Sequence, residues 1–314
     1  MLPHLPLEIV LDIIASSVPS APNALLNAAH PTTKLLLTFT LVSHGTRNLA
    51  NRYLRQYCVY LDSEQRLGSF LRSIPAHPAL RTITSLSLSP FQDDINNLPV
   101  CAWVRELLCY TSDTLRKLII DIPLRTCYPE DDHLGVRHVL REGFDRLVNL
   151  EEFMSTQDEL YLDTLEDQFA VVWLQWPKLK RLALWNVDAD ETFWRRVALH
   201  PSLQTLVLSS PDSIMEIDPK AEYLKHSVRS IRVLVSGSVS RRREDPGYTQ
   251  NADWDKQDSA KGMRLYQHDF PEFPEDIDRG RQEHHDYIKR AAEDGTLWEA
   301  EYAEVISPTQ LSTP

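Results

Sequence analysis

Residues 179–184 (LKRLAL) and residues 203–208 (LQTLVL) place apolar side chains in the same order, apolar-x-x-apolar-x-apolar. Side chains alternate between the two faces of a β-strand, so the last two apolar residues of each segment lie on one face. The first apolar residue then anchors the turn that enters the strand. The two segments therefore predict two short strands that bury the same face.

The same pattern occurs four more times along the chain. It begins at Ile83, Leu115, Leu150 and Val228, so the six starting positions lie 24 to 35 residues apart. Repeats of roughly 20 to 50 residues are typical of solenoids, in which each unit packs against its neighbours. The alternative is an ordinary α/β domain in which the leucines recur by chance, but six copies in series favour the solenoid.

Helical patterns fill the intervals between the predicted strands. One such segment follows each of the first four strands: residues 98–108, 133–147, 165–176 and 193–199. Parallel strands need a crossover connection, which a helix usually supplies. We therefore predict the α/β fold class, with residues 62–235 forming a leucine-rich-repeat-like solenoid of parallel strands with outer helices.

The residues before the repeats predict a small helical module. Pro6 suits the first turn of a helix over residues 5–14, because its missing N–H would be unpaired there. One apolar stripe of this helix would face the core of the module: Leu7, Val10, Leu11 and Ile14. Ile9 and Ile13 point to the opposite side. Three small helices can cover only one of these faces, so the second face indicates a partner protein.

Residues 35–61 complete the module. Residues 35–42 are almost entirely apolar, and a run of this length is too short to cross a bilayer, so it predicts a buried helix. Ser43 can cap the next helix. The apolar positions of that helix recur at helical spacing: Ala50, Tyr53, Leu54 and Tyr57.

Together these residues resemble an F-box. The positions that carry the resemblance are Leu5, Pro6, Glu8, Ile9, Leu41, Val42, Ser43, Arg47, Leu49, Ala50, Tyr53 and Leu54. The resemblance implies that residues 1–61 form a three-helix module that docks on a Skp-family adaptor. The residues expected to bind the adaptor are Leu5, Pro6, Glu8, Ile9, Ile13, Leu41 and Val42. Residues 15–34 form a longer joint between helices than most F-boxes carry.

An F-box followed by irregular leucine-rich repeats resembles a large group of fungal F-box proteins. This resemblance implies a substrate-recruiting subunit of an SCF-type ubiquitin ligase. Its partners would be the Skp-family adaptor, through it a cullin, and an unknown protein substrate. The alternative is a leucine-rich scaffold whose first helices cap the solenoid and bind no adaptor. Exposure of Pro6, Ile9 and Ile13 would favour docking, and their burial would favour the cap.

Strand residues that alternate with the core leucines are predicted to point away from the helices, onto an open face of the sheet. Trp185 is the most informative of them, because tryptophan and arginine are enriched in binding hot spots. Alternatively, this tryptophan packs under a loop. The residues expected to bind the substrate are Arg181, Trp185, Thr205 and Arg232.

The composition changes after residue 235. Residues 236–261 are polar and predict a loop, and residues 276–295 predict a surface helix. The segment from Gly295 to Trp298 (GTLW) is expected to fold back as a cap on the last repeat, because an open solenoid end needs covering. We therefore assign residues 236–314 to a charged loop and a C-terminal capping helix.

Motifs for catalysis or metal binding are absent from the sequence. No phosphate-binding loop or nucleophile elbow occurs. Residues 284–286 (HHD) are adjacent on a predicted helix, where side chains diverge by about 100° per residue, so they cannot chelate together and are expected on a solvated face. We expect no enzymatic activity, cofactor or metal. The net charge of −12 argues against nucleic-acid or anionic-membrane binding.

The cysteines and the N-terminus indicate a compartment. No cysteine spacing suggests a metal site or a disulfide framework, so reduced thiols are expected at Cys58, Cys101, Cys109 and Cys127. Residues 2–24 lack the basic start of a signal peptide, and no run of 18 apolar residues occurs. We expect a cytoplasmic or nuclear protein without a membrane span.

Overall fold

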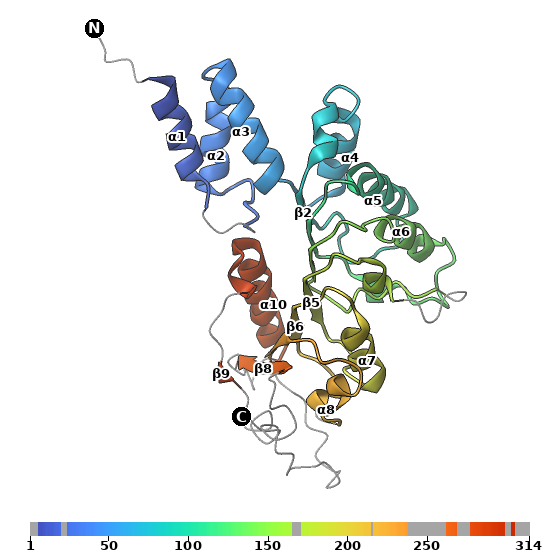
Figure 1. Cartoon of the computed structure of the whole chain (residues 1–314). Coiled ribbons are helices and arrows are strands. Elements are labelled where there is room, and N and C mark those ends of the chain that lie inside the picture. The colour runs from blue at the N-terminus through green and yellow to red at the C-terminus, as the bar shows by residue number, and fades with distance from the viewer. Residues whose placement is uncertain are drawn as a thin grey trace.

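The computed structural model describes residues 6–19, 24–164, 171–214, 216–237, 262–268, 277–298 and 303–304. Within these ranges the chain forms one nine-stranded sheet whose strands follow one another in chain order (Figure 1). Strands β1 to β8 are parallel, and β9 pairs antiparallel with β8 at the edge. The predicted α/β class and parallel sheet are therefore confirmed.

The strands are two to six residues long. Their bounds are β1 (Tyr60–Leu61), β2 (Ser85–Leu88), β3 (Lys117–Ile120), β4 (Glu152–Ser155), β5 (Arg181–Trp185), β6 (Thr205–Ser209), β7 (Ile231–Ser236), β8 (Met263–His268) and β9 (Ala303–Glu304). Strands β2 to β6 lie within or next to the segments that the repeated pattern predicts. Strands β1 and β8 were not predicted, although Met263 and Leu265 carry the apolar alternation and are buried.

The last copy of the pattern is displaced from its predicted start. Val233 of β7 is in register with Leu206, and Val235 is in register with Leu208. The repeat that aligns with its neighbours therefore starts at residue 230, two residues after the predicted Val228. That valine is 94% exposed. A displacement of two residues keeps each side chain on its predicted face, because the period of a strand is two.

Helices cover one face of the sheet. They are α4 (Glu64–Ser73), α5 (Leu98–Thr111), α6 (Val136–Phe144), α7 (Glu191–Leu199) and α8 (Pro219–Leu224), with the 3-10 helices η1 (Pro78–Thr82), η2 (Leu124–Thr126) and η3 (Val172–Gln175). The helix predicted over residues 165–176 is only the 3-10 helix η3 in its described part. The pattern leucines are buried between these helices and the sheet, including Leu86, Leu118, Leu182 and Leu206.

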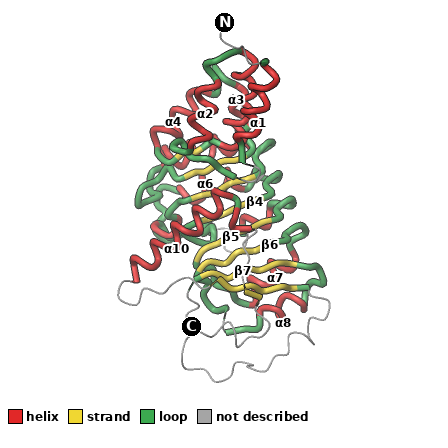
Figure 2. Tube along the Cα trace, turned by 90° about the vertical axis from the view of Figure 1, so that its left-hand side faces the viewer, coloured by secondary structure: helices red, strands yellow, loops and turns green. Residues whose placement is uncertain are grey.

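The opposite face, which we call the second face of the sheet, carries α10 (Ile277–Asp294) and the 3-10 helix η4 (Thr296–Trp298). Figure 1 shows α10 on the side of the strands away from α5, α6 and α7, and Figure 2 shows it lying across the strands. The sheet is thus the middle layer of three.

One backbone turn repeats at the carboxyl ends of three neighbouring strands. Asn186, Ser210 and Gly237 directly follow β5, β6 and β7 and have positive φ angles of 51°, 47° and 93°. The N–H of Asn186 donates to the carbonyl of Ser209, and that of Ser210 donates to the carbonyl of Ser236, both at 2.8 Å. The chain therefore leaves these three strands with a similar backbone turn, and the first two turns are bonded to the next strand.

Three helices precede the sheet: α1 (Leu7–Ser17), α2 (Pro31–Phe39) and α3 (His44–Tyr57). Ser43 caps α3, and the hydroxyl of Thr46 accepts from the N–H of Ser43 in return. Buried Ile14, Leu36 and Ala50 form the centre of their core. We refer to α1–α3 as the N-terminal module.

Two expectations for the N-terminal module are wrong. Leu7 was placed in its core but is about half exposed at the first residue of α1, where it adjoins the start of α3. The segment 35–42 was expected to be a buried helix. Instead α2 is buried mainly at Thr33 and Leu36, and it exposes Leu35 and Leu37.

Candidate functional site

Exposed large apolar side chains concentrate on the N-terminal module. Of the fourteen large hydrophobic residues that are exposed in the described part of the chain, seven belong to this module: Leu7, Ile9, Ile13, Leu35, Leu37, Leu41 and Val42. Single exposed apolar residues are ordinary on a protein surface, but their concentration on one small unit indicates an interaction site.

The residues expected to bind an adaptor lie on this surface. Ile9 and Ile13 are one helical turn apart on α1 and are 47% and 46% exposed. Leu41 and Val42, in the turn between α2 and α3, are 81% and 61% exposed. Pro6 and Glu8 are also exposed, and Leu5 lies outside the described residues. We call Pro6, Glu8, Ile9, Ile13, Leu41 and Val42 the N-terminal surface.

A local contact brings the start of α1 close to the turn between α2 and α3. A methyl of Leu7 lies 3.4 Å from the position that a Cβ on Gly45 would take, so the start of α1 adjoins the start of α3. The turn that carries Leu41 is held by a hydrogen bond from Arg47 Nε to the Thr40 carbonyl, at 2.9 Å. The exposed leucine and valine of the turn are therefore presented by a fixed backbone.

The second face of the sheet, expected to be open, is covered. A row of apolar residues crosses it in register: Ile119, Met154, Ala183, Val207 and Leu234. All five are buried, and they pack with Ile288 of α10 and with Leu297 and Trp298. The expectation of an open face is wrong because an apolar row of this length needs cover from water.

The four residues expected to bind substrate are placed on this second face, as their alternation predicts. Arg181, Thr205 and Arg232 are in register on neighbouring strands. Three of the four contact the protein itself. Arg181 Nη1 lies 2.6 Å from Glu152 Oε1, Arg232 Nη1 donates to the carbonyl of Trp298 at 2.9 Å, and the Trp185 ring packs 4.7 Å from that of His284. Thr205 is half-buried.

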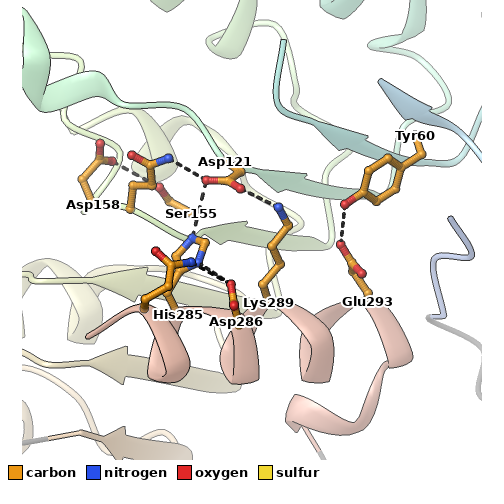
Figure 3. Close-up of polar contacts among 10 residues, drawn as sticks. Tyr60, Asp121, Ser155, Asp158, His285, Asp286, Lys289 and Glu293 are labelled. Atoms are coloured by element: carbon orange, nitrogen blue, oxygen red, sulfur yellow. Dashed lines mark hydrogen bonds and ion pairs between the residues drawn. The ribbon is translucent and has the colours of Figure 1, made fainter. Parts of the chain in front are cut away.

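A polar cluster centred on Asp121 joins α10 to the sheet (Figure 3). Asp121 follows β3, and its carboxylate accepts from Lys289 Nζ and from Gln157 Nε2, and lies 3.5 Å from His285 Nε2. Burial alone would raise the pKa of Asp121, but the bonds with His285 and Lys289 outweigh it and hold that pKa well below its usual range. The carboxylate is therefore ionised at ordinary pH.

The histidines of α10 were expected on a solvated face, and this is wrong. His284 is buried, with Nε2 2.9 Å from the hydroxyl of Ser236. His285 is four-fifths buried against Asp121. The helical period could have predicted the burial of His284. This residue lies one turn before Ile288, which the sequence places on the inner side of the helix. Asp286 alone has a half-exposed side chain, as expected.

The segment from Gly295 to Trp298 was expected to fold back as a cap on the last repeat, and it does contact β7, but on the second face of the sheet. Leu297 and Trp298 are buried in the cluster on the second face of the sheet, where the Trp298 carbonyl meets β7. They do not cap the end of the sheet. Residues 238–261 of the predicted loop lie outside the described part of the chain.

A buried lysine also attaches α10 to the sheet. Lys117 Nζ is buried under α10 and donates to the carbonyl of Ala292 at 2.8 Å, and burial lowers its pKa to about 8. Among the described residues, no group of three His, Cys, Asp or Glu side chains is placed to hold a metal ion, and no helix is long and apolar enough to cross a membrane. All four cysteines are free thiols.

Comparison of the chain with protein-family models, curated proteins and solved structures finds no match.

Proposed function

We propose that the protein is a non-catalytic, substrate-recruiting subunit of an SCF-type ubiquitin ligase, acting in the cytoplasm or nucleus. The N-terminal module would dock on a Skp-family adaptor, which connects to a cullin, and the sheet region would bind the protein substrate. The observation that carries the proposal is the exposure of Ile9 and Ile13 on α1, together with Leu41 and Val42.

This exposure supports docking over capping. A cap would bury Ile9 and Ile13 against the neighbouring strands, as core residues of a solenoid end are buried. Instead both isoleucines are about half exposed, and the N-terminal module packs around a core of its own. The alternative is a leucine-rich scaffold without a ligase role. In that case the partner of the N-terminal module would not be a Skp-family adaptor.

The substrate would bind beside α10, because the apolar row beneath the helix is filled. Arg181 and Thr205 are half-buried and border the covered area, so they remain within reach of a partner. Trp185 is held against His284, and we assign it to the attachment of α10.

The test of the proposal is the double substitution Ile9→Lys/Ile13→Lys. Burying each isoleucine in an interface contributes roughly 1.5–3 kcal/mol, and an unpaired lysine in its place costs more. We expect adaptor affinity to fall by at least about a thousandfold, or about 4 kcal/mol. Calorimetry with a purified Skp-family adaptor measures this directly.

The matched control is Leu199→Lys/Val228→Lys, which places two lysines at exposed apolar positions outside the N-terminal module. It should bind the adaptor as the wild type does. Undiminished binding by a folded Ile9→Lys/Ile13→Lys variant would refute the docking surface. Failure of the wild-type protein to bind the adaptor would favour the scaffold.

A further inference from the structure

We propose that α10 sets the orientation of the N-terminal module relative to the sheet, with Glu293 as the positioning residue at which the two parts meet. This inference goes beyond the proposed function, because it concerns how the module is attached whether or not it binds an adaptor. It follows from three observations: the module has a separate core, it is tied to α10, and α10 is fixed to the sheet.

The N-terminal module does not share its hydrophobic core with the sheet. Its cluster is centred on Ile14, Leu36 and Ala50, and within the described residues no strand contributes to it. The chain passes from Cys58, after α3, directly to β1 at Tyr60. A unit joined to its neighbour by one chain segment is free to pivot unless further contacts hold it. The orientation therefore depends on contacts outside the core of the module.

Two consecutive residues in the joint between α1 and α2 provide such contacts. Leu25 is buried in the same cluster as Ile288, and its N–H donates to the carbonyl of Glu293 at 2.6 Å. The N–H of Leu26 donates to the carbonyl of Tyr57 at the end of α3, at 2.7 Å. One residue bonds to α10 and the next bonds to α3, so the joint links the module to α10.

Glu293 makes a second connection through its side chain. The hydroxyl of Tyr60 donates to Glu293 Oε1 at 2.9 Å, at the point where the chain enters the sheet (Figure 3). One turn earlier in α10, Lys289 bonds to Asp121 beside β3. The last turn of α10 is therefore fixed to the sheet by Lys289 and by the Glu293 carboxylate, and it holds the module by the Glu293 backbone carbonyl.

The first experiment measures the distance between the two parts in the full chain. Spin-labelled amino acids are incorporated at two exposed positions, Asn48 on α3 and His138 on α6, and distances are recorded by pulsed electron paramagnetic resonance. We expect one narrow distance distribution in the otherwise wild-type protein. The variant Leu25→Ala/Tyr60→Phe/Glu293→Ala should give a broader distribution with a shifted mean.

The matched control is Glu283→Ala, which removes an ion pair to Arg279 on the exposed side of the same helix. Its distance distribution should equal that of the wild type. An unchanged distribution in the folded triple variant would overturn the proposal.

A second experiment avoids a variant that could fail to fold. Amide hydrogen exchange of the wild-type protein should show Leu25 as protected as the helical amides of α10, and Tyr60→Phe alone should speed its exchange by about fivefold, the effect of losing one hydrogen bond near it. Fast exchange of Leu25 in the wild type would overturn the inference. Both experiments use the free protein, so failure of adaptor binding leaves them unaffected.

Discussion

Gly237 determines how closely α10 can approach the sheet. Its φ angle of 93° lies in the region that only glycine adopts readily. A Cβ at this position would lie 2.4 Å from His284 Cε1 and 2.7 Å from the Ser210 hydroxyl oxygen. The same histidine bonds to Ser236, so the helix cannot move away without losing a buried contact. A single missing side chain thus allows helix and strand end to pack directly.

We therefore expect Gly237→Ala to lower the free energy of unfolding by about 3 kcal/mol or more, from backbone strain and overpacking together. Gly135→Ala is the control, because Gly135 has a φ of 66° but no atom near its would-be Cβ. Strain alone should cost about 1 kcal/mol there. Urea unfolding of both variants measures the difference. Equal losses would show that the contact with His284 is unimportant.

At the scale of one element, α10 is a mostly polar helix with a narrow apolar stripe. Ile288 and Ala292 are buried on the second face of the sheet, while Arg290 between them is exposed. Polar pairs at the edge of the apolar stripe complete the contact between α10 and the sheet, including the ion pair of Lys289 with Asp121. The apolar stripe is the part that excludes water from the sheet.

Ile288→Asp should therefore destabilise the whole sheet region. The substitution replaces a packed aliphatic group with a buried carboxylate, so we expect a loss of about 3 kcal/mol or more. Arg290→Asp places the same side chain on the exposed side of the helix and should change stability by less than about 0.5 kcal/mol. Thermal melts compare the two, and similar melting temperatures would argue against a fixed α10.

The attachment of α10 also depends on pH. Burial lowers the pKa of His285, but the bond and charge of Asp121 outweigh it, and the net pKa is raised. A histidine with a raised pKa stabilises the fold fully below its unfolded value of about 6.5, and this contribution is lost as pH rises through the folded value. The loss should therefore begin near neutral pH.

His285→Gln should remove this dependence. The stability difference between wild type and variant should be largest near pH 6 and should shrink as the pH rises above about 6.5. Asp158 titrates in the same range, because burial raises its pKa to about 7. Its contribution is the same in the wild type and in His285→Gln, so it cancels in the stability difference between them. Denaturant unfolding at several pH values tests this, and a difference that grows with pH would contradict it.

Elements that form through interactions between residues close in sequence could be predicted from the sequence. The alternation of Leu182 with Ala183 determines strand and face, because a period of two is a property of the chain itself. Five of the six predicted strands therefore lie within the predicted segments or end one residue beyond them, and the sixth is displaced by two residues. The cap of α3 was equally local: Ser43, whose hydroxyl accepts from the N–H of Thr46, was expected to cap the helix that follows it.

The covering of the sheet could not be predicted in this way. Which face α10 would cover depends on contacts between residues far apart in sequence, such as Ile288 with the row that includes Val207. The sequence pattern of α10 indicates a surface helix, which is correct for its outer side only. The exposure of Ile9 and Ile13 was easier to predict, because both residues fall on a different face of α1 from buried Ile14 within a single helix.

For the whole molecule, the attachment at Glu293 has a consequence for synthesis on the ribosome. Tyr60 and Glu293 are 233 residues apart, whereas each strand of the sheet pairs with the next one along the chain. Translation at roughly 5–20 residues per second separates their emergence by about 10 to 50 s. During that interval the early strands can pair as they appear. The apolar row from Ile119 to Leu234 is not yet covered, because α10 has not been synthesised. The nascent chain is therefore a candidate client for chaperones that shield apolar surface until the final helix is made.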